Sequence, residues 1–513
     1  MTSTVSKQPR TDRPLSRRRK WGFRLAAIAL GLSVLAAAEG VCILGGWGRP
    51  ADYPDPYVGF SEVHPLFVLN DAATRYEIAK SRRVYFAKQS FPATKGNDTY
   101  RIFCFGGSTV QGRPYSTATS FTKWLQLSLA AGDDRRNWEV VNCGGISYAS
   151  YRLTPILKEC LGYEPDLFVI CTGHNEFLED RTFSHIKHAH PLLAVPTRRL
   201  SRLRTATLLR SAVRDIVGSG RRVPDGRPVL PAETDPLLNY RNGIRAYHRD
   251  DEWRRGVVEH FEFNLRRMID LAAADGVPAV LVLPPSNLRE MPPFKSEHAA
   301  GLTAGELSRW HRLVEEARSL RSADPRQAVT LLEQAIGIDG RHAGTQYLLA
   351  TCYDALWRKT LDERFRDKAR SAYVAARDED VCPLRMISPL EVAMRRIAAE
   401  TGTPLIDAHA LLESKVADGI LGDEFLVDHI HPSPAEGHQA IAGALSRHLK
   451  KESIFQPPSD WRRNRDAAFR RHLEALARDQ NYFIRGQQTL RALDAWTKGR
   501  AEGPPIEKRT RSR

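Results

Sequence analysis

Residues 100–109 read Tyr100-Arg101-Ile102-Phe103-Cys104-Phe105-Gly106-Gly107-Ser108-Thr109, and this stretch decides how the chain folds. Its first six residues are mostly apolar and favour extended structure, so they predict a buried strand. The two glycines that follow predict a tight turn at the carboxyl end of that strand. Ser108 is therefore expected on a glycine-rich turn at the edge of a sheet.

Strand-like and helix-like segments alternate from residue 97 onward. Most of the expected strands are continuous apolar runs, which is typical of parallel strands covered on both faces. The pattern predicts a doubly wound, mostly parallel α/β sheet, whose ligands bind beyond the carboxyl ends of the strands. We expect strands at 100–105, 138–143, 166–172, 278–283 and 404–407, and helices at about 120–131, 151–161, 253–275, 390–401 and 434–449.

The positive charge of the chain is concentrated in three segments. The whole chain has a net charge of +16, whereas residues 1–24, 196–222 and 458–513 each carry a net charge of +7. The remainder is therefore slightly acidic. This distribution argues against a nucleic-acid enzyme and favours contact with an anionic surface such as lipid headgroups. We expect no nucleic-acid partner.

Seven cysteines in a chain of this length do not indicate a disulfide framework. Cys104, Cys143 and Cys171 each fall in an expected strand or at its end, where a free cysteine is usually a small buried hydrophobe. Cys352 and Cys382 remain a candidate pair if the domain lies outside the cytoplasm.

The N-terminal segment predicts a membrane-spanning helix. Leu25 to Trp47 is a run of 23 residues with one charge, Glu39, and it follows a basic leader. A helix of that length spans the roughly 30 Å of hydrocarbon in a bilayer. The basic flank should stay in the cytoplasm and the C-terminal body should lie on the other side. A cleaved signal peptide is the alternative, with Ala36-Ala37-Ala38 as its cleavage site, and it would export the body as well.

Three regions break the strand–helix alternation. Residues 311–378 are helical throughout and resemble tetratricopeptide repeats, which suggests a docking site for a protein partner or a helical hairpin that only packs on the sheet. Residues 198–217 predict a basic amphipathic helix, on a membrane or in solvent. The expected segments are a basic cytoplasmic tail (1–24), a transmembrane anchor (25–47), a lead-in (48–96), an α/β domain (97–310 plus 379–455), the insert (311–378) and a basic, partly helical tail (456–513).

Late in the chain, Asp428-His429-Ile430-His431-Pro432 brings a carboxylate and an imidazole three residues apart. A serine hydroxyl is a weak nucleophile that needs a nearby base, and the base needs an orienting partner. Ser108, His431 and Asp428 supply all three.

Four blocks fall at expected strand ends or loops: Gly106-Gly107-Ser108-Thr109, Asn142-Cys143-Gly144-Gly145-Ile146-Ser147, Gly173-His174-Asn175-Glu176 and Asp428-x-x-His431-Pro432. In this order they resemble the SGNH/GDSL hydrolase superfamily, whose domain is a three-layer, flavodoxin-like α/β sheet. The resemblance covers most of residues 97–310 and 379–450, and it covers neither the membrane segment, the insert nor the tail.

The resemblance implies a role for each matching residue. Ser108 is the expected nucleophile, His431 the general base, and Asp428 the group that orients the base. The backbone N–H of Ser108 and the side chain of Asn175 are expected in the oxyanion hole. The family's third donor is a glycine that here falls at Ser147, so either Ser147 or the earlier Gly145 should supply that N–H.

The sequence gives weaker support for other residues of the site. His174 follows a strand end, as do Asn287 and Arg289, and all three are candidates for the wall of the substrate pocket. His429 with His431, or the histidines His185, His188 and His190, could bind a metal. Because no further ligand at suitable spacing accompanies either cluster, we expect no metal. No Gly-x-x-x-x-Gly-Lys loop is present, and no nucleotide cofactor is expected.

Three functions remain open at this point. The first is an exported, membrane-anchored serine esterase that cleaves an acyl or acetyl ester, on a glycan or a lipid, through an acyl-enzyme on Ser108. The second is an acyl transferase that passes the same acyl group to a carbohydrate hydroxyl. The third is a membrane-tethered scaffold with a vestigial site, whose insert binds a protein partner.

Overall fold

The computed structural model describes residues 17–45, 64–178 and 243–497, with a few isolated positions between them. The chain divides into two compact units. The first comprises Met1–Pro54 and His190–Asp225, and the second comprises Asp55–Ala189 and Gly226–Arg513. Each unit is described by itself. His185, His188 and His190, most of the expected helix at 198–217, and the tail beyond residue 497 lie outside the described residues.

The first unit contains one long helix, α1 (Arg17–Leu44). Its segment Leu25–Leu44 is long and apolar enough to cross a membrane, although a signal sequence near an N-terminus meets the same description. Glu39 is the only charged residue in that segment. Its carboxylate accepts hydrogen bonds from the Thr205 backbone N–H at 3.0 Å and the Thr205 hydroxyl at 2.8 Å.

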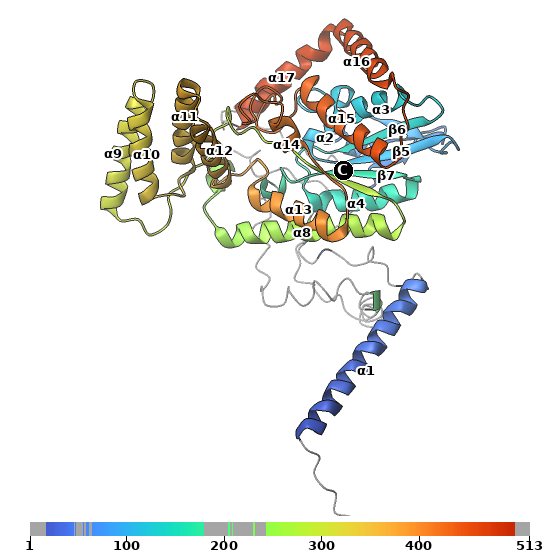
Figure 1. Ribbon diagram of the computed structural model, residues 1–513. Coiled ribbons are helices and arrows are strands. Elements are labelled where there is room, and N and C mark those ends of the chain that lie inside the picture. Colours follow the sequence, from blue (N-terminus) through green and yellow to red (C-terminus); the bar gives the residue numbers. More distant parts are fainter. Residues whose placement is uncertain are drawn as a thin grey trace, which may run out of the picture. The chain divides into compact units, whose positions relative to one another are not determined.

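The second unit is built on a five-stranded parallel sheet with the strand order β10-β9-β7-β5-β6. Taken along the chain, this is the order 2-1-3-4-5 of flavodoxin-like sheets, and it confirms the predicted fold class. The strands are β5 (Thr99–Gly106), β6 (Asn137–Gly144), β7 (Leu167–Cys171), β9 (Ala279–Leu283) and β10 (Leu405–Asp407), all close to the ranges expected from the sequence (Figure 1).

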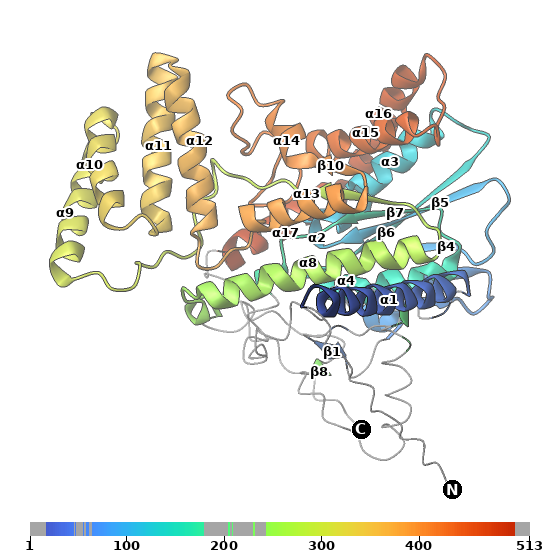
Figure 2. The same cartoon turned by 60° about the horizontal axis from the view of Figure 1, so that its bottom comes forward.

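Helices cover both faces of this sheet (Figures 1 and 2). One layer contains α3 (Phe121–Ala130), α15 (Glu436–Lys451) and α16 (Trp461–Arg478), and the other contains α4 (Ser150–Cys160), α8 (Asp251–Ala274) and α13 (Ser388–Thr401). Alternate strand residues face the two layers, because side chains of a strand point to opposite sides in turn. Ile102 and Cys104 pack with Trp124 of α3 in one core, whereas Phe103 and Phe105 contact Phe168 on the other side.

Further short elements surround the sheet. A three-stranded antiparallel sheet in the lead-in packs against β5 through the contacts of Phe67 and Phe91 with Phe103. The elements are β1 (Gly59–Phe60), β2 (Phe67–Leu69), β3 (Arg75–Ile78), β4 (Ser90–Pro92), β8 (Val229–Leu230), α2 (Ser108–Gln111), α14 (Ala408–Glu413) and the 3-10 turns η2 (Lys80–Arg82), η3 (Thr117–Thr119), η4 (Leu161–Tyr163) and η8 (Gly243–Ala246).

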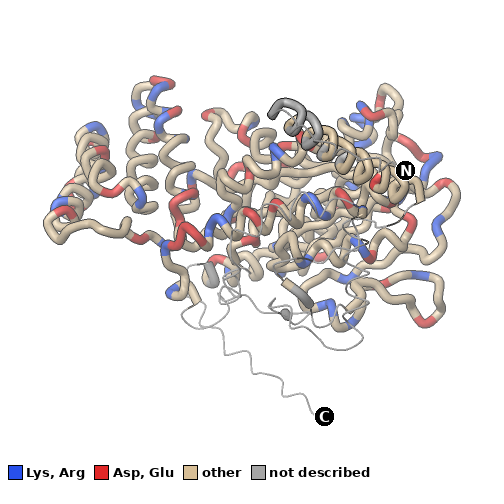
Figure 3. The backbone as a smooth tube through the Cα atoms, turned by 90° about the horizontal axis from the view of Figure 1, so that it is seen from below, with Lys and Arg blue, Asp and Glu red and all other residues tan. Residues whose placement is uncertain are grey.

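All seven cysteines are free and buried. Cys104, Cys143 and Cys171 are core residues, as predicted from their positions in the strands. Cys352 and Cys382 are not paired with each other. Along the described chain, Lys and Arg lie among Asp and Glu, so the helices present mixed charge (Figure 3).

The insert is a set of four helices with a core of its own. The helices are α9 (Ala304–Leu320), α10 (Pro325–Ile338), α11 (Ala343–Thr360) and α12 (Glu363–Asp378), and each packs on the next. Side chains cap their N-termini, among them Thr303 in a reciprocal capping box with Glu306. Trp310, Leu332 and Tyr353 belong to a buried cluster within the insert. The helical region thus begins at residue 304, seven residues before the expected boundary.

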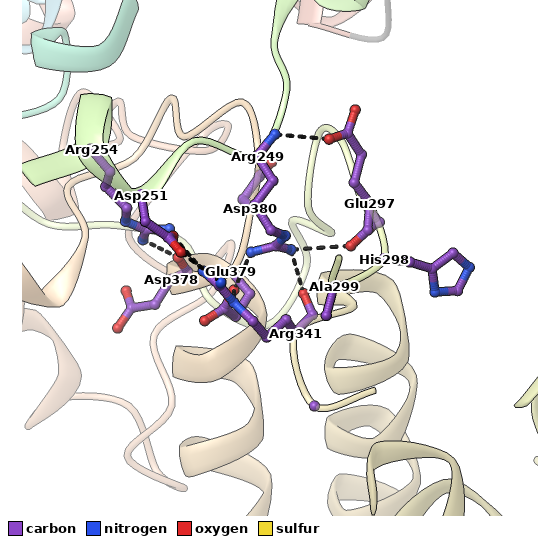
Figure 4. Close-up of polar contacts among 12 residues, drawn as sticks. Arg249, Asp251, Arg254, Glu297, His298, Ala299, Arg341, Asp378, Glu379 and Asp380 are labelled. Carbon is purple, nitrogen blue, oxygen red and sulfur yellow. Dashed lines mark hydrogen bonds and ion pairs between the residues drawn. The ribbon is translucent and has the colours of Figure 1, made fainter. Parts of the chain in front are cut away.

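A network of charged side chains joins the insert to α8 and the preceding loop (Figure 4). Arg249 donates to Glu379 at 2.5 Å and to the Arg341 carbonyl at 2.6 Å. Arg341 in turn pairs with Asp251 through two hydrogen bonds of 2.8 and 2.6 Å. The Arg249 backbone N–H donates to Glu297 at 2.8 Å. The contact of the insert with α8 is therefore ionic, whereas Leu288 and Ile420 from outside the insert join its buried apolar cluster.

The segment expected as a basic tail contains two packed helices, α16 and α17 (Gln480–Thr497). Trp461 and Phe469 of α16 are buried in the core shared with α3 and α15. On α17, the Tyr482 hydroxyl lies 2.9 Å from Thr119 Oγ1, and Phe483 makes an edge contact with Tyr115. The basic residues occupy the outer faces of these helices, so their composition resembles a solvated tail although their apolar residues are packed.

Candidate active site

Ser108 lies at the first position of α2, directly beyond the carboxyl end of β5. β5 is flanked by β6 and β7, and this is where the strand order of the sheet reverses. Ligands of such sheets bind at the reversal point. The turn is crowded, because a Cβ on Gly107 would lie 2.4 Å from Asn175 Nδ2, and one on Gly144 would lie 2.2 Å from the Gln111 backbone nitrogen. Glycine at both positions lets three strand ends approach one another.

Ser108, His431 and Asp428 form a hydrogen-bonded chain. His431 Nε2 lies 2.7 Å from Ser108 Oγ, and His431 Nδ1 lies 2.7 Å from Asp428 Oδ2. Since an ionised carboxylate only accepts hydrogen bonds, Nδ1 carries the proton and Nε2 is free to accept the serine proton. All three side chains are buried. The structure therefore brings together the three residues that the sequence singled out for nucleophilic chemistry.

Asp428 is held as an anion by its surroundings. Its second oxygen, Oδ1, accepts the backbone N–H groups of Ile430 at 2.9 Å and His431 at 2.8 Å. Burial by itself would raise the pKa of the Asp428 carboxyl. The rings of His431 and His429 and these hydrogen bonds outweigh burial, and they hold the pKa well below its ordinary value. These contacts thus favour the ionised form of the carboxylate.

Two of the expected oxyanion donors face the same cavity as Ser108. Asn175 and Ser147 both line it. The Asn175 amide donates one N–H to the Tyr148 carbonyl at 3.1 Å, which leaves its second N–H for a ligand. Ser147 has a positive φ of 61°. Within the described part of the chain, its backbone N–H has no hydrogen-bond acceptor.

Gly145, the alternative third donor, does not offer its N–H to a ligand. That group donates to the Gly106 carbonyl at 2.9 Å and so continues the pairing of β5 with β6. The sequence suggests Gly145 as a donor because the family's third donor is a glycine. The register of β6 uses the Gly145 N–H in the sheet, and it leaves Ser147 as the residue with an available N–H.

The cavity at Ser108 has a volume of about 250 Å³. Its polar wall contains the triad's Ser108 and His431 together with His429, Arg113 and Asn175. Its apolar wall is formed by Ile146, Leu178, Leu384, Ile430, Ala492 and Leu493. Ala492 and Leu493 come from α17, so a helix that the sequence placed in a tail forms part of the site.

His429 faces the cavity as a neutral ring. Burial lowers its pKa to about 4, an effect that Asp428 opposes and His431 reinforces. Among the described residues, no three His, Cys, Asp or Glu side chains form a group that could hold a metal ion. His429 and His431 therefore have no third ligand nearby in the described chain.

The three candidate wall residues do not line the cavity. His174 is buried, and its Nδ1 accepts the Met386 backbone N–H at 3.1 Å. Asn287 is fully buried, and its amide donates to Asp423 at 2.7 Å. Arg289 pairs with Asp418 and lies 3.6 Å from Asp354 of the insert. All three follow strand ends, as predicted, but their side chains turn into the protein to meet partners far away in the sequence.

Arg113 and Leu493 are among the cavity residues that the sequence analysis missed. Arg113 follows a glycine turn five residues after Ser108, and no strand or motif marks it. Leu493 lies in a basic helix. The only signal for Leu493 was the apolar spacing of residues 480–497, which is weak beside so many charges.

Comparisons with known proteins give a structural likeness only. No protein-family model and no curated protein matches the chain. The chain is similar to a protein described as lipolytic and of the G-D-S-L family from Desulfitobacterium hafniense, with 13% identity, a TM-score of 0.29 and coverage of 68% of this chain and 99% of the other. A lipase/acylhydrolase from Enterococcus faecalis shows 14% identity, a TM-score of 0.30 and coverage of 70% and 99%. The acetylxylan esterase Axe2 from Geobacillus stearothermophilus shows 12% identity, a TM-score of 0.29 and coverage of 70% and 96%.

Proposed function

We propose that this protein is a serine ester hydrolase of the SGNH/GDSL type, which acts through an acyl-enzyme on Ser108. The observation that carries the proposal is the chain of two 2.7 Å hydrogen bonds from Ser108 through His431 to Asp428, at the reversal point of the sheet. A nucleophile, a base and an orienting carboxylate in hydrogen-bond contact are the arrangement that activates a serine.

The reaction follows from the positions of these groups. Ser108 Oγ attacks the ester carbonyl carbon while its proton passes to His431 Nε2. The carbonyl oxygen becomes an oxyanion, which accepts hydrogen bonds from the N–H groups of Ser108, Ser147 and Asn175. Each such donor is worth about 3–4 kcal/mol when it is aimed at the developing charge. Asp428 stabilises the imidazolium that forms.

The second half of the reaction reverses these proton movements. The tetrahedral intermediate collapses, the C–O bond to the leaving alcohol breaks, and His431 Nε2 donates its proton to that alcohol. Water then gives a proton to His431 and attacks the acyl-enzyme, which releases the acid and restores Ser108. A sugar hydroxyl in place of water would give the acyl transferase reaction.

We further propose that the hydrolase unit is held at a membrane by α1, with the N-terminus in the cytoplasm and the unit on the other side. The basic leader and the apolar segment Leu25–Leu44 support this arrangement. Residues 311–378 are proposed to dock a protein partner. The substrate is proposed to be an ester borne by a glycan or a lipid.

Turnover of 4-nitrophenyl acetate by the whole chain tests the proposed chemistry. Ser108→Ala should lower kcat/KM by about 10³-fold or more, because a triad acts as a unit. Ser371→Ala on α12 is the matched control, since that exposed hydroxyl bonds only within its helix. Circular dichroism should be unchanged in both variants. Turnover by Ser108→Ala equal to that of the control would refute the proposal.

A further inference from the structure

Arg113 is the one cation that the described structure places in the wall of the cavity, and the proposed reaction does not use it. The Arg113 backbone N–H donates to the Ser108 carbonyl at 3.1 Å. Gly112, with a φ of +92°, turns the chain between them. The nucleophile and the guanidinium group are thus carried by the same short turn and face the same cavity.

The guanidinium group of Arg113 differs from other arginines in the interior of this unit. Arg101 pairs with Glu139 at 2.7 Å, Arg377 pairs with Glu391 at 2.6 Å, and Arg289 pairs with Asp418. Arg113 has no ion pair and no side-chain hydrogen bond to any described residue, and its side chain is only partly exposed. A guanidinium group in such a position gains from an anionic partner through charge-assisted hydrogen bonds.

Among the residues that the structure describes, no group near Arg113 is free to supply an anion. Asp428 is the nearest acidic influence, but one of its oxygens is occupied by His431 and the other by two backbone N–H groups. Burial lowers the pKa of Arg113, whereas the charge of Asp428 raises it. Guanidinium groups remain protonated at neutral pH in proteins. The cavity therefore presents a permanent positive charge beside the nucleophile.

We propose that Arg113 binds an anionic group of the substrate, a carboxylate or a phosphate, so that the natural ester of this enzyme carries a negative charge near the bond that Ser108 attacks. A planar guanidinium group binds both anions through paired hydrogen bonds. The lining also includes the apolar side chains of Ile146, Leu384 and Leu493, which suit the hydrocarbon part of the same molecule. This inference rests on the proposed function and adds a substrate class to it.

The test compares how fast two matched fluorophosphonates label Ser108 in the whole chain. One probe ends its alkyl chain in a carboxylate, and the other carries the methyl ester of that carboxylate. The wild-type protein should react at least about tenfold faster with the anionic probe, since hydrogen bonds between a guanidinium group and a carboxylate are charge-assisted. Arg113→Gln should bring the ratio of the two rates close to one, and Arg113→Lys should retain part of it.

Controls and competitors sharpen this experiment. Arg463→Gln on α16 is the matched variant, because the Arg463 side chain is 81% exposed, and it should keep the wild-type ratio. Acetate and inorganic phosphate, compared with chloride at equal ionic strength, should protect Ser108 from the neutral probe, and the stronger competitor identifies the anion. A wild-type ratio of one, or an unchanged ratio in Arg113→Gln, would overturn the inference while leaving the hydrolase proposal intact. No labelling of Ser108 by either probe would overturn both.

Discussion

The sheet unit around Ser108 and the helical insert are held in place by different forces. At the site, the groups are packed so closely that a carbon added at Gly144 would overlap the backbone of α2, and one added at Gly107 would overlap the Asn175 amide. The insert is joined to α8 by the side chains of Arg249, Arg341 and Glu379. Backbone packing fixes a position to a fraction of an ångström, whereas ion pairs can be lost one at a time. A single substitution in the first region is therefore expected to cause a large loss of activity. Substitutions in the second should weaken the attachment of the insert step by step.

Among the substitutions that probe this comparison, the largest effect is expected where an added methyl group meets the proposed oxyanion hole. Gly107→Ala should lower kcat/KM for 4-nitrophenyl acetate by about 10²–10³-fold, because the new Cβ displaces the Asn175 amide, one donor of the hole. Gly256→Ala on α8, where nothing lies within 4 Å, is the matched control. If Gly107→Ala acts by displacing Asn175, the double variant with Asn175→Ala should show little further loss of kcat/KM. Fully additive losses would contradict it.

Acid should destabilise the sheet unit through histidines that are buried as neutral rings. Burial lowers the pKa of His438 to about 3. Because this folded value is below the unfolded one, His438 contributes stability above about pH 6.5 that is lost as the pH falls toward 3. His438→Asn keeps an acceptor for the Phe121 N–H. Between pH 6.5 and 4.5, the free energy of unfolding of this variant should fall by about 2–3 kcal/mol less than that of the wild type, measured by urea unfolding. An unchanged slope of stability against pH would contradict this assignment.

Loss of one ion pair should loosen the insert and spare the site. Arg249→Gln removes the bonds to Glu379 and to the Arg341 carbonyl, and should cost about 2 kcal/mol. Amide hydrogen exchange should rise in α12 and in the turn before α11, with ester turnover within twofold of wild type. Arg364→Gln, whose side chain is 87% exposed, should change neither. A large loss of turnover in Arg249→Gln would mean that the two regions are coupled.

The smallest effect is expected at α17. This helix does not belong to the parallel sheet, but its residue Leu493 lines the cavity. A Cβ on Gly486 would lie 2.0 Å from the Tyr115 ring. Gly486→Ala should therefore shift α17 and its Leu493 outward, raising KM for a longer-chain ester a few-fold with kcat within twofold. Gly305→Ala on α9 has open space and should leave both constants unchanged. A fall in kcat alone would show that α17 acts on the triad rather than on binding.

The sheet and the reactive residues could be predicted because their signals are local. Each strand is an apolar run, and Ser108, Asn175, Asp428 and His431 stand in short blocks next to strands or turns. The failures have a common physical cause. Asn287 and Arg289 follow a strand end, but acidic residues more than 120 positions later draw them inward. The many arginines of residues 461–497 made the apolar face of these helices hard to recognise in the sequence. No local pattern indicates that Arg113 lines the cavity.

The central claim is an activated Ser108, and fluorophosphonate labelling followed by peptide mapping tests it most directly. Displacement of fluoride by Ser108 Oγ requires that His431 accept its proton. We expect label on Ser108 in the whole chain, and a labelling rate lower by about 10³-fold or more in His431→Gln. Label on another residue, or equal labelling of Ser108 with and without His431, would show that Ser108 is not activated as proposed.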